Sequence, residues 1–371
     1  MYRLRRCLLV CCSLIGWLAC SGFGPPILTD GGYPPLRLGP DEIAGLTALT
    51  RPPGLTAKSA LLFDLDSGQT LYALHPDDPL PPASTAKVMT ALVVLQNADL
   101  DDSVTVSPIA GQTPGSRMGL TGGETLTVRE LLYGLLLPSG NDAAVALAEH
   151  VAGTEADFVT LMNRTAAELG LKATHFTGPH GMDAPKQTSN AADLLVLTRA
   201  ALQYPVFAEI VATQTAEIGG MALTNTNELL GNYPGADGIK TGTTDAGGEC
   251  LVASATRRGH RLLASVLGSQ DRYADVRALL DYAAAGWRWT PTGLPSNALA
   301  WESDPAGQPH RLRTVGASDI FLPAWQGALL QPIRRLDATV YLTATLPVGE
   351  LRWVLGGETL ATEPLSVWRG P

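Results

Sequence analysis

Between residues 59 and 290, the apolar positions recur with the spacing of helices or of strands. Apolar residues three or four positions apart predict helices over 84–96, 130–137, 142–151, 155–169 and 272–287. Two pairs of alternating or apolar runs, each joined by a short polar turn, predict β-hairpins over 60–74 and 250–268. This part of the chain is therefore expected to form one large domain, assigned to residues 57–290.

The pattern changes on both sides of this domain. Residues 21–56 contain many Pro and Gly residues and show little periodicity, which predicts a tether. After about residue 290, Pro and Gly rise again, residues 339–346 alternate with a period of two, and the Gly356-Gly357 turn predicts a further hairpin. Residues 291–371 are therefore expected to form a small β-rich domain.

The first twenty residues have the pattern of an export signal. Three arginines precede an apolar run over 7–19, which is too short to span a bilayer as an ordinary helix. Leu18-Ala19-Cys20 resembles the end of a bacterial lipoprotein signal, in which the cysteine is lipidated and becomes the new N-terminus. We expect an exported protein of the cell envelope or periplasm, tethered to the membrane by a lipid on Cys20. Ordinary cleavage nearby, after Ser21 or Gly22, is the alternative.

Composition and charge exclude other classes. The 371 residues are 45% hydrophobic and 16% charged, so the chain can build a large core. The net charge is −9 and no basic block is present, so nucleic acid is not an expected partner. The six histidines are scattered, without H-E-x-x-H or paired C-x-x-C patterns, so neither a metal nor a cofactor is expected. Cys250, in an apolar run, is expected to fill the core.

Three short motifs point to the chemistry. They are Ser84-Thr85-Ala86-Lys87, Ser139-Gly140-Asn141 and Lys240-Thr241-Gly242, in this order along the chain. Each one is common by itself, but the three together are typical of a serine acyl-transfer enzyme that uses lysine as its base.

Ser84 and Lys87 are the predicted nucleophile and base. At positions i and i+3 of a helix they share one face, within hydrogen-bonding reach. A lysine acts as a base only when its pKa is lowered, and a helix N-terminus, apolar surroundings or a second cation such as Lys240 lower it. Taken alone, the pair reads as a capping serine and a solvent-facing lysine, and the other motifs favour the catalytic interpretation.

The second motif is expected to assist this pair. The Ser139 hydroxyl is predicted to relay a proton towards the leaving amine, and the Asn141 amide to bind a substrate carbonyl and position Lys87. By itself, Ser139-Gly140-Asn141 is also consistent with a turn between two helices.

The third motif is expected at the start of a strand and supplies the predicted substrate-binding residues. Lys240 and Thr241 can hold a substrate carboxylate, while Gly242 lets a backbone approach closely. The backbone N–H groups of Ser84 and Thr243 are the predicted oxyanion hole.

Residues 57–290 resemble the serine-type D-alanyl-D-alanine carboxypeptidases, the low-molecular-mass penicillin-binding proteins. The resemblance extends to the flanks of the motifs, over 137–143, 168–183, 225–230 and 237–247. It implies an α/β fold in which an antiparallel sheet is flanked by helices, with an all-helical subdomain. It also implies removal of the terminal D-alanine from peptidoglycan stem peptides through an acyl-serine, with β-lactams as covalent inhibitors.

The sequence departs from this family at several points. Thr226 stands where some members carry an arginine, and Glu249 stands where an aromatic residue is usual. His180 lies in a matching segment and is expected to be structural. Many members end in an amphipathic membrane-binding helix that this chain lacks, which places the expected anchor at Cys20.

Three other functions use the same motifs. A β-lactamase needs a glutamate on a loop between Ser139 and Lys240, and no segment there offers one convincingly. A D,D-endopeptidase is harder to separate by sequence. A non-catalytic wall-binding or β-lactam-sensing protein has no need for the complete set of motif residues.

Overall fold

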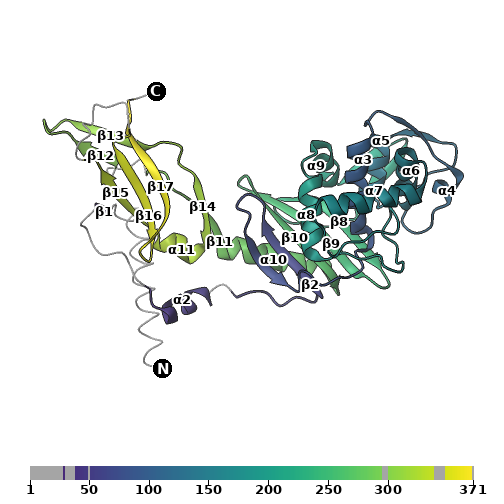
Figure 1. Cartoon of the computed structure of the whole chain (residues 1–371), viewed down its shortest axis with the longest axis horizontal. Helices are drawn as coiled ribbons and strands as arrows, with labels where there is room; N and C mark the ends of the chain where they lie inside the picture. Colours follow the sequence, from purple (N-terminus) through teal and green to yellow (C-terminus); the bar gives the residue numbers. More distant parts are fainter. Residues whose placement is uncertain (1–27, 30–37, 49–50, 295–299, 338–346, 370–371) are drawn as a thin grey trace. The chain divides into compact units, whose positions relative to one another are not determined.

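The computed structural model describes residues 28–29, 38–48, 51–294, 300–337 and 347–369 (Figure 1). The chain divides into two compact units. One unit is Pro52–Ala283, which contains all three motifs, and the other combines residues up to Arg51 with Ala284–Pro371. The boundary after the motif-bearing unit therefore falls at 283/284 rather than at the expected 290/291.

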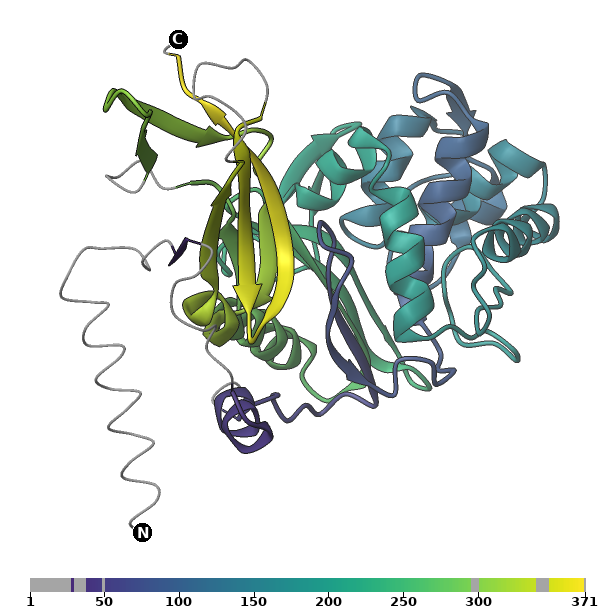
Figure 2. The same ribbon diagram turned by 60° about the vertical axis from the view of Figure 1, so that its left-hand side comes forward.

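The motif-bearing unit is built on a five-stranded antiparallel sheet with the order β3-β2-β10-β9-β8. Its strands are β2 (Ser59–Asp64), β3 (Thr70–Leu74), β8 (Ala236–Thr244), β9 (Gly248–Arg257) and β10 (His260–Ser269). Helix α10 (Arg272–Gly286) and helix α8 (Ala191–Ala201) lie on opposite faces of this sheet (Figure 2). Because both faces are covered, the central strands are almost continuously buried.

The remaining helices of this unit form a group on the side of the sheet where α8 lies (Figure 1). They are the 3₁₀ helix η1 (Ala83–Ala86), α3 (Lys87–Asn97), α4 (Pro108–Gln112), α5 (Val128–Leu136), α6 (Asn141–Ala152), α7 (Glu155–Glu168) and α9 (Pro205–Ala212). The unit also contains two small antiparallel strand pairs: β4 (Ser103–Thr105) with β5 (Thr125–Thr127), which enclose α4, and the hairpin of β6 (Thr215–Ile218) with β7 (Met221–Thr224). Residues 87–94 of α3 are all buried, so α3 runs through the centre of the helical group.

Side-chain caps fix where several of these helices begin. The Thr127 hydroxyl accepts the backbone N–H of Glu130, whose carboxylate accepts the N–H of Thr127 in return. Thr154 and Asn190 accept N–H groups three residues later, at the starts of α7 and α8. These capping patterns are local in the sequence. The starts predicted at 130 and 155 lie within two residues of the observed starts of α5 and α7, whereas α8 was not predicted.

The second unit contains a six-stranded sheet with the order β1-β15-β16-β17-β13-β12 and a pair formed by β11 and β14. The strands are β1 (Leu28–Thr29), β11 (Trp287–Pro291), β12 (Trp301–Ser303), β13 (Pro309–Thr314), β14 (Asp319–Pro323), β15 (Gln331–Leu336), β16 (Gly349–Leu355) and β17 (Glu358–Val367). Two short helices accompany them, α2 (Pro40–Thr47) and α11 (Ala324–Leu329). A small apolar core around Leu351 and Leu365 holds the sheet together.

The expected fold class is confirmed: an antiparallel sheet with helices, an all-helical part and a C-terminal β region. Three details differ from the sequence-based expectations. The helix predicted over 84–96 begins with the 3₁₀ turn η1, and the one predicted to reach 287 ends at Gly286 because Trp287 pairs with β14. The segment predicted as a tether contains α2, which Pro40 and the Glu42 carboxylate start.

Some expectations fall on residues outside the described ranges. These are the signal with Cys20, most of the predicted tether and the strand predicted over 339–346. Among the helices of the described ranges, none is by itself long and apolar enough to cross a membrane. Only α8 and α9 taken together pass on length and composition, and they are bent by 114°.

Candidate active site

Ser84 and Lys87 meet at the junction of η1 and α3. The Lys87 Nζ atom lies 2.9 Å from the Ser84 Oγ atom. Lys87 is fully buried, so its ammonium form lies in a medium that solvates charge poorly. An amine at this distance can accept the serine proton once the amine itself is neutral.

Two further acceptors fix the Lys87 amine. Its Nζ atom donates to the Asn141 Oδ1 atom over 2.7 Å and to the His180 carbonyl over 2.8 Å. Burial lowers the pKa of Lys87 well below its usual value, the nearby Lys240 lowers it further, and Asp142 opposes the shift. The environment therefore favours the neutral amine that a general base needs.

The second motif is held by a buried carboxylate. Asn141 begins α6, and its Nδ2 atom donates to the Pro114 carbonyl over 2.7 Å. The next residue, Asp142, is 0% exposed and accepts the backbone N–H groups of Met118, Gly119 and Leu120. Together these bonds fix the loop 114–120 against the start of α6, and so fix the amide that contacts Lys87.

Ser139 lies beside this loop in a constrained backbone conformation. Its φ of +65° is in the left-handed region, and the residue is buried. No atom of the described residues hydrogen-bonds to the buried Ser139 hydroxyl. The hydroxyl is therefore free to bond to a group that enters the site.

The third motif lies in the middle of β8, at the edge of the sheet, and not at a strand start as expected. A Cβ atom on Gly242 would come within 2.7 Å of the Ser84 N atom, so only glycine allows β8 to lie this close to η1. The Thr241 hydroxyl lies 2.6 Å from the Thr226 hydroxyl. The backbone donor of Ser84 and the motif strand thus face each other.

Lys240 is the second buried cation of the site. Its Nζ atom donates to the Thr241 carbonyl over 3.0 Å. Burial and the charge of Arg272 lower the pKa of Lys240 to about 7. Lys240 therefore changes its charge near neutral pH.

Two residues that were not predicted also contact the motifs. Arg272 donates to the Gly242 carbonyl over 2.7 Å and to the Thr243 hydroxyl over 2.6 Å. As the first residue of a predicted helix it carried no local signal that set it apart. His180, expected to be structural, contributes its backbone carbonyl to Lys87.

The His180 ring is held neutral. The Met182 N–H donates to its Nδ1 atom over 3.2 Å, which places the ring proton on Nε2. Burial, together with the charge of Lys87, lowers the pKa of His180 to about 4. The segment is pressed against η1, since a Cβ on Gly181 would lie 2.0 Å from the Ala83 carbonyl.

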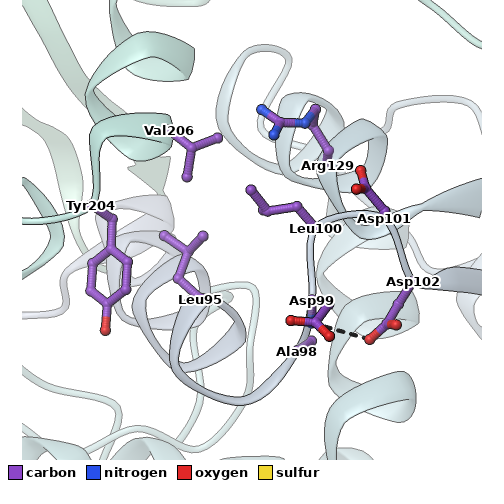
Figure 3. A pocket seen from close by; sticks show the side chains of 9 residues that line it. All are labelled: Leu95, Ala98, Asp99, Leu100, Asp101, Asp102, Arg129, Tyr204 and Val206. Atoms are coloured by element: carbon purple, nitrogen blue, oxygen red, sulfur yellow. Dashed lines mark hydrogen bonds between the residues drawn. The ribbon is translucent and has the colours of Figure 1, made fainter.

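A separate pocket of about 580 Å³ lies at the C-terminal end of α3 (Figure 3). Apolar side chains of Leu95, Leu100 and Val206 line it together with Arg129 and three aspartates. None of the predicted site residues is among its lining residues. Nor do the described ranges contain a group of three or more His, Cys, Asp or Glu residues that could hold a metal.

The fold and the Ser84 site define a serine acyl-transfer enzyme of the penicillin-binding class. The chain belongs to the peptidase S11 family of D-alanyl-D-alanine carboxypeptidases, because the model of that family matches residues 47–271. The resemblance found in the sequence is therefore confirmed.

Individual relatives agree with this assignment. The D-alanyl-D-alanine carboxypeptidase DacF of Bacillus subtilis is 38% identical over 328 residues, which cover 84% of each chain. DacB2 of Mycobacterium tuberculosis is 43% identical over 217 residues, covering 57% of this chain and 74% of the relative. Among solved structures, penicillin-binding protein 5 of Haemophilus influenzae is 30% identical with a TM-score of 0.65, covering 85% of this chain and 98% of that one.

Proposed function

We propose that this protein is a D,D-carboxypeptidase that removes the terminal D-alanine from peptidoglycan stem peptides through an ester on Ser84. β-Lactams acylate the same serine. The observation that carries this proposal is the buried Lys87 amine, 2.9 Å from the Ser84 hydroxyl and oriented by Asn141 and His180.

Acylation begins with neutral Lys87. Its two N–H groups donate to the Asn141 amide oxygen and the His180 carbonyl, so its lone pair points to the Ser84 hydroxyl. Lys87 takes the proton as Ser84 Oγ attacks the carbonyl carbon of the penultimate D-alanine. The negative charge that forms on the carbonyl oxygen is stabilised by the backbone N–H groups of Ser84 and Thr243.

Collapse of this intermediate breaks the peptide bond. The proton on Lys87 passes through the Ser139 hydroxyl to the nitrogen of the departing D-alanine, which leaves as the free amino acid. Water then attacks the Ser84 ester while Lys87 accepts its proton. The bond from the acyl carbon to Ser84 Oγ breaks, Lys87 returns the proton to Oγ, and the shortened stem peptide leaves with a new carboxyl group, which restores the enzyme.

Lys240 and Thr241 hold the terminal carboxylate of the stem peptide. A cationic Lys240 supplies the charge and Thr241 a hydroxyl donor. Thr226 hydrogen-bonds to Thr241 and carries no charge, whereas some family members have an arginine near this position.

The test combines two assays on the mature protein. A fluorescent penicillin should label Ser84 in a long-lived adduct, located by peptide mass spectrometry, and a D-Ala-D-Ala pentapeptide should yield free D-alanine. Rapid penicillin turnover would instead indicate a β-lactamase. Hydrolysis of a cross-linked stem-peptide dimer to monomers, without release of D-alanine from the pentapeptide, would indicate a D,D-endopeptidase. Absence of acylation would refute every enzymatic version, including this one.

We further propose that the protein is exported and anchored by a lipid on Cys20. The supporting observation is the signal pattern, with its three arginines, apolar run and terminal Leu18-Ala19-Cys20. Expression in a bacterium with lipoprotein processing, followed by membrane fractionation, tests this proposal. Cys20→Ser should move the protein to the soluble envelope fraction, and Cys12→Ser, inside the apolar run, is the matched control. Membrane association that persists in Cys20→Ser would rule out the lipid as the tether.

A further inference from the structure

Glu249 stands directly opposite Thr243 across the β8–β9 pair. Its Oε2 atom accepts the backbone N–H of Arg272 over 3.0 Å and lies 3.3 Å from the Arg272 Nε atom. The arginine side chain of this ion pair is 13% exposed and the glutamate side chain 36% exposed. The pair is thus partly withdrawn from water, at the rim of the Ser84 site.

The terminal nitrogens of Arg272 donate to acceptors in β8 and β9. One terminal nitrogen donates to the carbonyls of Gly242, over 2.7 Å, and Cys250, over 3.2 Å. The other donates to the Thr243 hydroxyl over 2.6 Å. The guanidinium therefore bridges β8 and β9 next to Thr243, whose N–H is a predicted donor of the oxyanion hole.

Glu249 is one of two carboxylates that cap α10, and it accepts the N–H of the first residue. The Asp271 carboxylate accepts the N–H groups of Tyr273 and Ala274, over 3.1 and 2.9 Å. Glu249 adds a counter-charge and a second fixing point for the Arg272 side chain, which a helix start alone does not need.

We propose that Glu249 is a positioning residue for acyl transfer: it holds Arg272 against Gly242 and Thr243 near the end of β8 and balances the arginine charge next to Lys240. This inference rests on the proposed function, since it assigns Glu249 to the same reaction. Without Glu249, Arg272 keeps its charge but loses the contact that fixes the Nε side of its guanidinium.

The charges around Lys240 determine in which direction each substitution should shift the pKa of Lys240. Arg272 from α10 and Lys87 from α3 are the cations that face this region, and Glu249 from β9 is the carboxylate paired with Arg272. Asp183 approaches the same end of the strands by accepting the Ala246 N–H. The charge of Arg272 lowers the pKa of Lys240, so loss of that charge should raise it. We expect loss of the Glu249 charge, which balances Arg272, to lower the pKa of Lys240 further.

Glu249→Gln and Arg272→Gln are the test variants, because each removes the charge and keeps a polar side chain. Glu249→Gln also keeps the length of the original side chain, whereas the glutamine at position 272 is shorter than arginine. The measurement is the pH profile of kcat/KM for D-alanine release, with kcat and KM separated, and the rate of Ser84 acylation by a fluorescent penicillin. Glu168→Gln is the matched control, because it removes a glutamate from the exposed Arg164–Glu168 pair on α7.

Glu249→Gln should lower kcat about fivefold. It should also move the alkaline limb of the pH profile, where activity falls as Lys240 loses its charge, down by about half a pH unit, as expected for a partly exposed pair. Arg272→Gln should move that limb in the opposite direction, while Glu168→Gln leaves the profile unchanged. A purely structural pair would lower activity in both variants without opposite shifts, and that result overturns the positioning role.

Failure of the proposed function gives a different result. A wild-type protein that forms the penicillin adduct but releases no D-alanine refutes the carboxypeptidase assignment, and the acylation rates of the variants still test Glu249. A wild-type protein inactive in both assays overturns both proposals. Wild-type activity with an unchanged Glu249→Gln profile overturns the positioning role alone.

Discussion

The Lys87 amine lies 2.9 Å from the Ser84 hydroxyl although the two residues belong to different helical elements. Ser84 sits in the 3₁₀ helix η1, and Lys87 is the first residue of α3. A 3₁₀ turn has three residues per turn, so side chains at i and i+3 stand directly above one another. The tighter turn therefore aligns the serine with the lysine better than the regular helix that the apolar pattern predicts.

Ser84→Ala should abolish both the penicillin adduct and D-alanine release. Loss of the nucleophile from a serine hydrolase lowers kcat by a factor on the order of 10⁴ or more. Mass spectrometry of the labelled protein and a D-alanine assay measure the two losses, and circular dichroism checks the fold. Ser67→Ala, in the turn between β2 and β3, serves as the control. A folded Ser84→Ala protein that still forms the adduct would refute Ser84 as the nucleophile.

The two buried lysines predict a bell-shaped pH profile for acylation. Activity should rise with pH through the lowered pKa of Lys87, because the base must lose its proton, and fall above about 7, where Lys240 loses its positive charge. Stopped-flow acylation rates between pH 4 and 10 measure both limbs.

Lys240→Arg separates the limbs. An arginine stays charged throughout this range, so the alkaline limb should move up by about two pH units or more while the acid limb stays in place. An alkaline limb that remains near neutral pH in Lys240→Arg would assign that ionisation to another group.

Asp142→Asn should destabilise the protein as well as slow it. The carboxylate accepts three backbone N–H groups from 118–120 and lies 3.6 Å from the Arg117 side chain, and an amide cannot replace all of these contacts. The expected cost is about 3 kcal/mol, or a melting temperature lower by about 8 °C. Asp101→Asn, at an exposed position, is the control, and equal melting temperatures for the two variants would contradict the role given to Asp142.

Gly242→Ala should block acylation while leaving most of the fold in place. The added Cβ would come within 2.7 Å of the Ser84 N atom and 3.0 Å of the Thr85 N atom, so β8 and η1 must move apart. We expect acylation to slow by about two orders of magnitude. Gly45→Ala in α2, where a Cβ meets nothing within 4 Å, is the matched control. Wild-type acylation by Gly242→Ala would show that the close approach is dispensable.

The sequence predicts the elements of this protein where local signals are strong. The N-cap pattern at Thr154 and the apolar or alternating runs of β9 and β10 depend on neighbouring residues, and these three elements lie where expected. The ends of α10 and η1 depend instead on tertiary pairing. Trp287 leaves the helix because β14 is available to it, and no local pattern announces a partner more than thirty residues away.

The candidate site divides along the same line. The types and spacing of the residues in the three motifs predict their chemistry. In the structure, Lys87 contacts both Ser84 and Asn141. The contributions of His180 and Arg272 could not be read from the sequence. His180 acts through a backbone carbonyl, which every residue has. Arg272 contacts the Gly242 carbonyl of β8 from 30 residues further along the chain, a contact that only the tertiary fold creates.

The close approach of Gly242 to the Ser84 N–H has a consequence for drug resistance. A donor that belongs to the main chain survives replacement of its own side chain by any residue except proline. We therefore expect substitutions that confer resistance to a β-lactam to change other side chains of the site or the packing that positions this donor. The backbone N–H of Ser84 is therefore the part of the site that substitutions can alter least.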